Sequence, residues 1–122
     1  PETQVELALT DARAIGIKVP VRESGKLAGT PGCKLVGPAG EVELEKGVIA
    51  ALRHVHLNPA QAEALGVKDK DIVSVRVNGE RAIVFENVLV RAGDAYFGEI
   101  HLDTDEGNAA GLGPDAMGTI IK

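Results

Sequence analysis

The segment Val55–Val67, VHLNPAQAEALGV, sets the plan of this 122-residue chain, because two other segments repeat its pattern. They are Val5–Ile17, VELALTDARAIGI, and Ile100–Leu112, IHLDTDEGNAAGL. Each begins with an aliphatic residue, a Glu or His and a leucine, and each ends at the same spacing with a glycine and an aliphatic residue. The chain therefore contains an internal repeat of one structural unit.

Each repeat predicts a short strand, a capped helix of about two turns and a glycine that ends the helix in a left-handed conformation. The alanines between cap and glycine favour the helix. The predicted caps are Ser, Thr, Asn or Asp side chains that can accept a backbone N–H: Thr10, Asn58, and Asp103 or Thr104.

Two further segments predict β-hairpins. One contains Asn78-Gly79 within alternating apolar and polar residues, and the other, GCKLVGPAGEVELEKGVI (32–49), turns near Gly37–Gly40. Together these signals predict a mainly β fold with short helices (α+β), as a small β-barrel decorated by two-turn helices. We expect residues 1–122 to form a single β-barrel-like unit.

Composition restricts the partners. Aromatic residues make up 2% of the chain and the formal net charge is -5, so nucleic acid and anionic membranes are not expected partners. No apolar run reaches membrane-span length, which favours a cytoplasmic protein. The one cysteine, Cys33, excludes an intrachain disulfide, and we interpret it as a small apolar filler of the core.

The second position of each repeat holds a residue that can bind zinc: Glu6, His56 or His101. His54 lies two residues before His56, so the two imidazoles of a predicted strand face the same way. If the repeats pack around a common axis, these side chains converge on a metal ion, for which zinc is the preferred candidate. The alternative is that the second position merely points outward and the histidines are solvated or structural.

Two arginines are candidates for catalysis beside this site. Arg53 is adjacent to His54, and Arg91 closes a predicted strand. The alternative for either residue is a surface salt bridge.

Three stretches carry a resemblance to a known family. LRHVHLNPAQAEALGVKDKDIVSVRVNGERAIVFENVLVR (52–91), GEIHLDTDEGNAAGL (98–112) and VPVRESGKLAGTPGCKLVGPAGEVELEKGVI (19–49) together resemble the propanediol-utilisation type of phosphotransacylase, the phosphate propanoyltransferases. The resemblance covers essentially the whole chain.

The resemblance implies a zinc-dependent phosphate acyltransferase that converts acyl-CoA and phosphate into acyl phosphate and coenzyme A. It implies a pair of small β-barrels with the active site and two zinc ions between them. By this resemblance His54, His56 and His101 bind one zinc and Glu6 binds the other. Asn108, together with His101, is assigned to cofactor binding, with coenzyme A as a substrate.

The sequence departs from the family at its beginning. An earlier H-x-H motif that completes the second zinc site, and a phosphate-binding arginine expected just ahead of Gln4, are absent from this chain. We therefore expect the chain to be the C-terminal part of a two-barrel enzyme, with a missing N-terminal segment or a companion chain as partner. The sequence leaves open whether the protein is a homo-oligomer and whether it resides in a bacterial microcompartment.

Two other interpretations stay open at this point. The stretch NPAQAEALGVKDKDIVSVRVNG (58–79) is also similar to the double-psi barrels that bind cofactors without a metal. A non-catalytic structural zinc module is the other, and closed coordination by four ligands would favour it.

Overall fold

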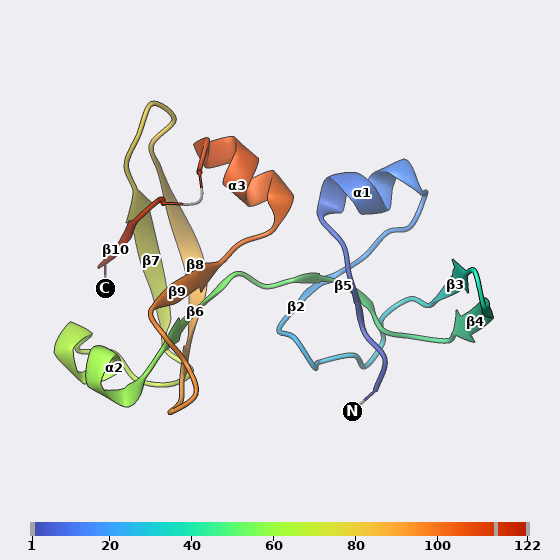
Figure 1. Cartoon of the computed structure of the whole chain (residues 1–122), viewed down its shortest axis with the longest axis horizontal. Coiled ribbons are helices and arrows are strands. Elements are labelled where there is room, and N and C mark those ends of the chain that lie inside the picture. The colour runs from blue at the N-terminus through green and yellow to red at the C-terminus, as the bar shows by residue number, and fades with distance from the viewer. Residues whose placement is uncertain (1, 114, 122) are drawn as a thin grey trace. The chain divides into compact units, whose positions relative to one another are not determined.

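The computed structural model describes residues 2–113 and 115–121 and divides into two compact units, Pro1–Leu52 and Arg53–Lys122 (Figure 1). Each unit is described by itself below. The chain is mainly β with short helices, which confirms the predicted fold class. The expectation that residues 1–122 form one barrel-like unit of a two-barrel enzyme stays a prediction.

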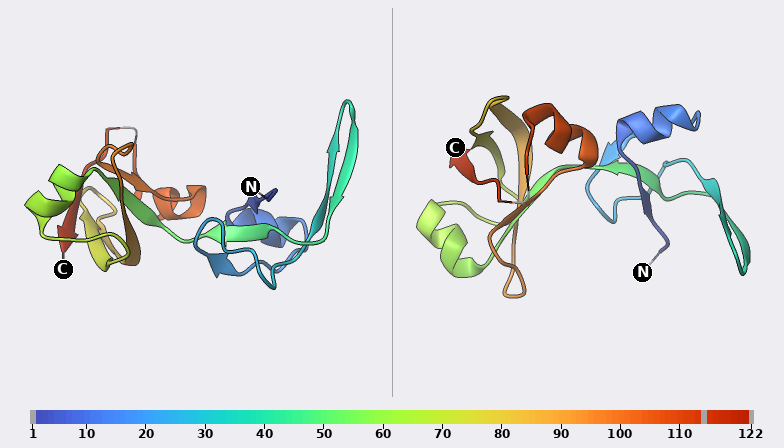
Figure 2. Two further views of the ribbon diagram at one scale, coloured as in Figure 1. Left: turned by 90° about the horizontal axis from the view of Figure 1, so that it is seen from below. Right: turned by 45° about the horizontal axis from the view of Figure 1, so that its top comes forward.

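The N-terminal unit combines a parallel sheet with a separate hairpin. Strand β5 lies in the middle of the sheet, between β1 and β2, and β3 pairs with β4 in the hairpin. The hairpin extends away from the sheet (Figure 2). The bounds of the elements are β1 Val5–Glu6, α1 Leu9–Ala14, β2 Val21–Arg22, β3 Cys33–Gly37, β4 Gly40–Leu44 and β5 Val48–Ala51.

The C-terminal unit is built on one curled sheet with the strand order β10-β7-β8-β6-β9. Strand β6 runs parallel to β8 and antiparallel to β9, so it is enclosed on both edges. The elements are β6 His54–Leu57, α2 Pro59–Leu65, β7 Ile72–Val77, β8 Ile83–Ala92, β9 Glu99–His101, α3 Thr104–Ala110 and β10 Gly118–Ile121.

Aliphatic residues fill both cores, as the low aromatic content requires. In the C-terminal unit, Val88 and Val90 of β8 are fully buried against Val75 and Val77 of β7 and against Phe85. In the N-terminal unit the core cluster is smaller and contains Ala12, Val19, Val48 and Ala50, with the half-buried Cys33 packed against it, and Ile49 of β5 is also fully buried. Since burial of apolar surface contributes about 25 cal/mol per Å², the larger core makes the C-terminal unit the firmer support for a site.

The three repeats each form a helix of six or seven residues, but their caps differ. Asn58 caps α2 and Asp103 caps α3, each in a reciprocal capping box with the side chain three residues later. The prediction of Thr10 as a cap is wrong. Helix α1 begins at Leu9, so Thr10 lies inside the first turn, and the buried Ala8 occupies the cap position without a side-chain bond.

The glycine stops and both hairpins are confirmed. Gly66 and Gly111 are left-handed at the ends of α2 and α3, and Gly16 has a φ of 78° just after α1. The β3–β4 hairpin turns between Gly37 and Gly40. The β7–β8 hairpin pairs Val77 with Ile83, so its loop is longer than a two-residue Asn-Gly turn.

The helices of the described residues are all too short to span a lipid bilayer.

We expect Asn58→Ala to lower the free energy of unfolding by about 1 kcal/mol, because Asn58 Oδ1 accepts the backbone N–H of Gln61 at 2.9 Å. Urea unfolding followed by circular dichroism measures the change. The matched control is Glu63→Ala, which removes an exposed side chain from the same helix. Equal stability of the Asn58 variant and the wild-type chain would contradict the capping assignment.

Candidate metal centre

The register of the C-terminal sheet brings the three histidines to one face. On strand β6, His54 and His56 alternate with the buried Val55 and Leu57, so both imidazoles point away from the core. Residue His101 of β9 pairs directly with His54 across the antiparallel edge. Residues directly opposite each other in a sheet share a face, so the pairing places all three imidazoles together.

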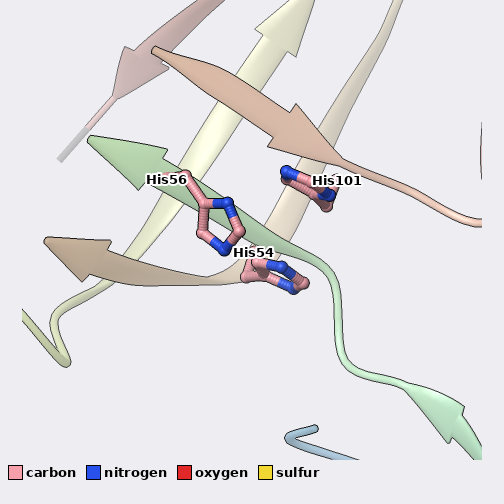
Figure 3. Close-up of side chains that lie close together, drawn as sticks. All are labelled: His54, His56 and His101. Carbon is pink, nitrogen blue, oxygen red and sulfur yellow. The ribbon is translucent and has the colours of Figure 1, made fainter. Parts of the chain in front are cut away.

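The three imidazoles lie close enough to hold one ion (Figure 3). One ligand atom from each of His54, His56 and His101 lies within 4.8 Å of the other two. The ring centroid of His56 is 4.7 Å from that of His54 and 4.2 Å from that of His101. The rings of His54 and His101 are nearly parallel, with centroids 4.8 Å apart. These nitrogens come from two strands far apart in the sequence.

Atom Nε2 of His56 is the observation that best tests whether a metal fits. It is a buried nitrogen with no hydrogen-bond partner among the described residues. A buried polar atom without a partner costs free energy, and a metal ion would remove that cost. The imidazole set also matches zinc, which binds neutral His nitrogens at about 2.0–2.1 Å. The residues present therefore fit a zinc ion.

The charge state of His56 also suits a metal ligand. Burial lowers the pKa of His56 below its ordinary value, and the neighbouring imidazoles of His101 and His54 and the Arg91 guanidinium lower this pKa further. The carboxylate of Glu99 acts in the opposite direction. A lowered pKa keeps the ring neutral at pH 7, and only the neutral ring can donate its lone pair to a metal.

A carboxylate lies beside the cluster. Glu99 is two residues before His101 on β9, and its Oε2 is 3.4 Å from Nε2 of His101. Metal-binding histidines commonly direct their second ring nitrogen to a carboxylate, which fixes the ring orientation. Glu99 on β9 pairs directly with His56 on β6, so the two side chains lie on the same face of the sheet.

Sequence reasoning missed Tyr96, which lies in the loop between β8 and β9. Its ring stacks on that of His56, with centroids 4.0 Å apart and planes 7° from parallel. The only available signal was the scarcity of aromatic residues, since the chain holds one tyrosine and two phenylalanines. In so aromatic-poor a chain, an aromatic residue five positions before His101 is a candidate neighbour of the site.

Arg53 is held by three groups around it. Its Nε donates to the Glu86 carbonyl at 2.7 Å, and its Nη1 donates to Oε2 of Glu106 at 2.8 Å. The guanidinium lies 5.4 Å from the ring centroid of Phe85. Because Glu106 also accepts the backbone N–H of Asp103 at 3.0 Å, Arg53 ties the start of β6 to the cap of α3.

The other predicted residues lie on three different elements of the fold. Arg91 of β8 pairs with His56 across the parallel edge of β6, which places it beside the imidazoles. Asn108 is exposed on α3, and its carbonyl accepts a bond from Arg81. Glu6 belongs to β1 of the N-terminal unit, where its Oε1 accepts a hydrogen bond from Gln4 Nε2 at 2.6 Å.

Known proteins resemble this chain over nearly its whole length. A model of the family described as phosphate propanoyltransferase matches residues 1–113. The phosphate propanoyltransferase of Sebaldella termitidis is 51% identical over 122 residues, covering 99% of this chain and 57% of that protein. That of Thermotoga maritima is 50% identical over 122 residues, covering 99% and 58%, and that of Listeria monocytogenes is 46% identical over 121 residues, covering 99% and 57%. The chain spans a little over half the length of these relatives.

We expect Arg53→Ala to lower the free energy of unfolding by about 1–3 kcal/mol, because Glu106 and the Glu86 carbonyl lose a charged donor. Urea unfolding of the variant measures it. Arg76→Ala, on the exposed face of β7, is the control and should change stability by less than about 0.5 kcal/mol. Similar effects of the two substitutions would show that the Arg53 contacts contribute little.

The lowered pKa of His56 predicts a pH dependence of stability in the metal-free chain. Between its lowered pKa and the ordinary value of 6.5, the unfolded chain takes up a proton that the folded chain does not. The free energy of unfolding should therefore fall as the pH falls below about 6.5, and His56→Gln should remove this component. Unfolding measured between pH 5 and 8 (about these limits) in chelator tests it. If the free energy of unfolding of His56→Gln depended on pH in the same way as that of the wild-type chain, this prediction would be contradicted.

Proposed function

The chain belongs to the phosphate propanoyltransferase family, and from that premise we propose that it forms part of a phosphotransacylase. The proposed reaction transfers a short acyl group between coenzyme A and inorganic phosphate, so that acyl-CoA and phosphate give acyl phosphate and coenzyme A. The observation that carries this proposal is the coincidence of the family match with a three-histidine cluster on one sheet face. The remaining length of the relatives would be supplied by a further segment or a companion chain.

We assign zinc to His54, His56 and His101. The cluster found among the described residues has three members, and three protein ligands with one open position are typical of catalytic zinc. A zinc ion there would supply Lewis-acid chemistry, polarising a carbonyl or phosphate oxygen or stabilising a leaving thiolate. A structural zinc module would need a fourth protein ligand, so the three-membered cluster favours catalysis over that alternative.

Arg91 is the residue that we propose for binding the anionic substrate. It stands directly opposite His56 on the neighbouring strand, so its guanidinium shares the face of the three imidazoles. An arginine can bind a phosphate oxyanion through two parallel hydrogen bonds and hold it beside the reacting carbonyl. Arg53 was the other candidate, and its bonds to Glu86 and Glu106 favour a supporting role for it.

Two further residues complete the proposal. Asn108 is an exposed residue of α3, and we assign its side-chain amide to the binding of coenzyme A, as the family resemblance implies. Glu6 is proposed as a ligand of a second zinc, with the Gln4 amide orienting its carboxylate. No group near the cluster is assigned as a covalent nucleophile, and direct attack of phosphate on the thioester carbonyl is the simplest route.

The metal assignment predicts that the chain binds about one zinc ion at the histidine cluster and that His56→Ala weakens binding more than about 100-fold. Competition with a chromophoric chelator, with elemental analysis of the dialysed protein, measures both. Cys33→Ala is the control, because the thiol belongs to the other unit and should leave zinc binding unchanged. Full zinc occupancy in the His56 variant would exclude this ligand set.

The activity itself is tested by thiol release from acetyl-CoA and propanoyl-CoA with and without phosphate. We expect phosphate-dependent release when the chain is mixed with a polypeptide that covers the remaining length of a relative, and loss of release in Arg91→Ala. Arg76→Ala is the matched control for removing a strand arginine. Release that does not depend on phosphate would identify a thioesterase and contradict the proposal.

A further inference from the structure

The loop that joins β8 to β9 places one aromatic side chain against the candidate metal centre. Tyr96 stacks on His56 with ring centroids 4.0 Å apart and an angle of 7° between the planes. The rings of His54 and His101 contact His56 at angles of 47° and 52°. The imidazole of His56 therefore lies close to three other rings, of which that of Tyr96 is the one stacked on it.

Several backbone contacts hold the loop in this position. The N–H of Gly93 donates to the Leu57 carbonyl at 3.0 Å, and the N–H of Tyr96 donates to the Gly93 carbonyl at 3.1 Å. One residue earlier, the N–H of Ala92 donates to Oδ1 of Asp69 at 2.8 Å. These bonds turn the chain directly after β8, next to the end of β6 that follows His56.

Gly93 leaves the space that the tyrosine ring occupies. A Cβ atom at position 93 would lie 3.1 Å from Cε2 and 3.2 Å from Cδ2 of Tyr96, which is closer than ordinary contact. The Tyr96 ring is thus confined between the backbone of its own turn and the imidazole of His56.

Core packing does not account for Tyr96. The side chain is half-buried and lies outside the apolar cluster that fills the C-terminal unit. The adjacent Phe97 is 75% exposed, so the loop does not bury aromatic side chains in general. Among the described residues, the ring that Tyr96 stacks on is the imidazole of His56.

Stacking of this kind has a direct effect on a metal ligand. Rotation of an imidazole about χ2 is only weakly restricted in an isolated side chain, so a free ring loses entropy when it binds an ion. A flat ring 4.0 Å away restricts this rotation before the metal arrives and excludes water from one face of the imidazole. Groups that orient metal ligands by hydrogen bonds typically change metal affinity by about 10–100-fold, and we expect an effect of the same order from a stacked ring.

We propose that Tyr96 is a positioning residue, whose ring holds the His56 imidazole in the orientation that binds the metal. This inference rests on the proposed zinc site and deepens it. It assigns the tyrosine no contact with the reacting atoms. The ring rather than the hydroxyl performs this role, so phenylalanine can replace tyrosine.

Zinc and cobalt titrations of the 122-residue chain test the proposal. Tyr96→Ala should weaken zinc binding by about 10–100-fold and alter the visible spectrum of the cobalt-substituted protein, because the orientation of one ligand is released. Tyr96→Phe should retain wild-type affinity and spectrum. Phe97→Ala is the matched control, since it removes an exposed ring from the same loop and should change neither.

A second measurement examines the ring in the absence of metal. In the wild-type chain, the ring current of Tyr96 should shift the imidazole proton signals of His56 upfield, and Tyr96→Phe should preserve the shift. Tyr96→Ala should move these signals toward the positions of a freely rotating histidine. The unfolding transition of each variant separates this effect from loss of the fold.

The outcomes distinguish this inference from the proposed function. If the chain binds zinc and Tyr96→Ala binds it as tightly with the same cobalt spectrum, the positioning role is wrong and the metal site stands. If Tyr96→Phe weakens zinc binding as much as Tyr96→Ala does, stacking of the ring does not explain the effect and the positioning role is wrong. Failure of the wild-type chain to bind zinc overturns the metal site together with this role.

Discussion

The pairing of β6 with β9 is the constraint on which the candidate site depends. These strands are joined by about 40 residues of chain that form a helix and a long hairpin, yet their register sets His54 directly opposite His101. A shift of one residue would turn the imidazoles of β6 into the core and bring Val55 and Leu57 to the surface. The hydrophobic core therefore fixes the position of the histidines, because the same strand supplies both faces.

The local structure supports this register at both ends of β6. Before the strand, Arg53 bonds to Glu106 and so connects β6 with the cap of α3. After the strand, Asn58 caps α2, and the Leu57 carbonyl accepts a bond from the turn that carries Tyr96. The helices of the sequence repeat are six or seven residues long, which is too short to form a layer of their own. Helices α2 and α3 directly follow β6 and β9, the two strands that carry the histidines.

The sequence predicts the individual helices and strands better than it predicts how the strands pair. The repeat predicted the helices and their glycine stops because these depend on neighbouring residues. It failed at Thr10, because α1 begins one residue earlier, with the buried Ala8 at its cap position and no side-chain cap. The shared face of His54 and His56 follows from strand geometry alone. The cross-strand partner of His54 and the packing of Tyr96 depend on the register of distant segments, which no local pattern encodes.

The family match and the geometry address different parts of the account. Membership in the phosphate propanoyltransferase family supports the proposed class of chemistry, while the sheet shows which side chains of this chain meet. The two agree at the histidine cluster, where three imidazoles converge and the buried Nε2 atom of His56 has no hydrogen-bond partner among the described residues, an arrangement that fits a zinc ion. Arg53 shows how geometry alone can suggest a role. Its bonds to the Glu86 carbonyl and to Glu106 account for its position by support of the fold, with no catalytic role required.

X-ray absorption spectroscopy of the zinc-loaded chain tests the central claim most directly. The account predicts three imidazole nitrogens at about 2.0–2.1 Å from zinc, completed by one light scatterer from solvent, with the imidazole pattern reduced in a His101→Ala variant. A first shell of oxygens alone, or a sulfur at about 2.3 Å, would show that the metal is bound elsewhere and would contradict the convergence of these histidines.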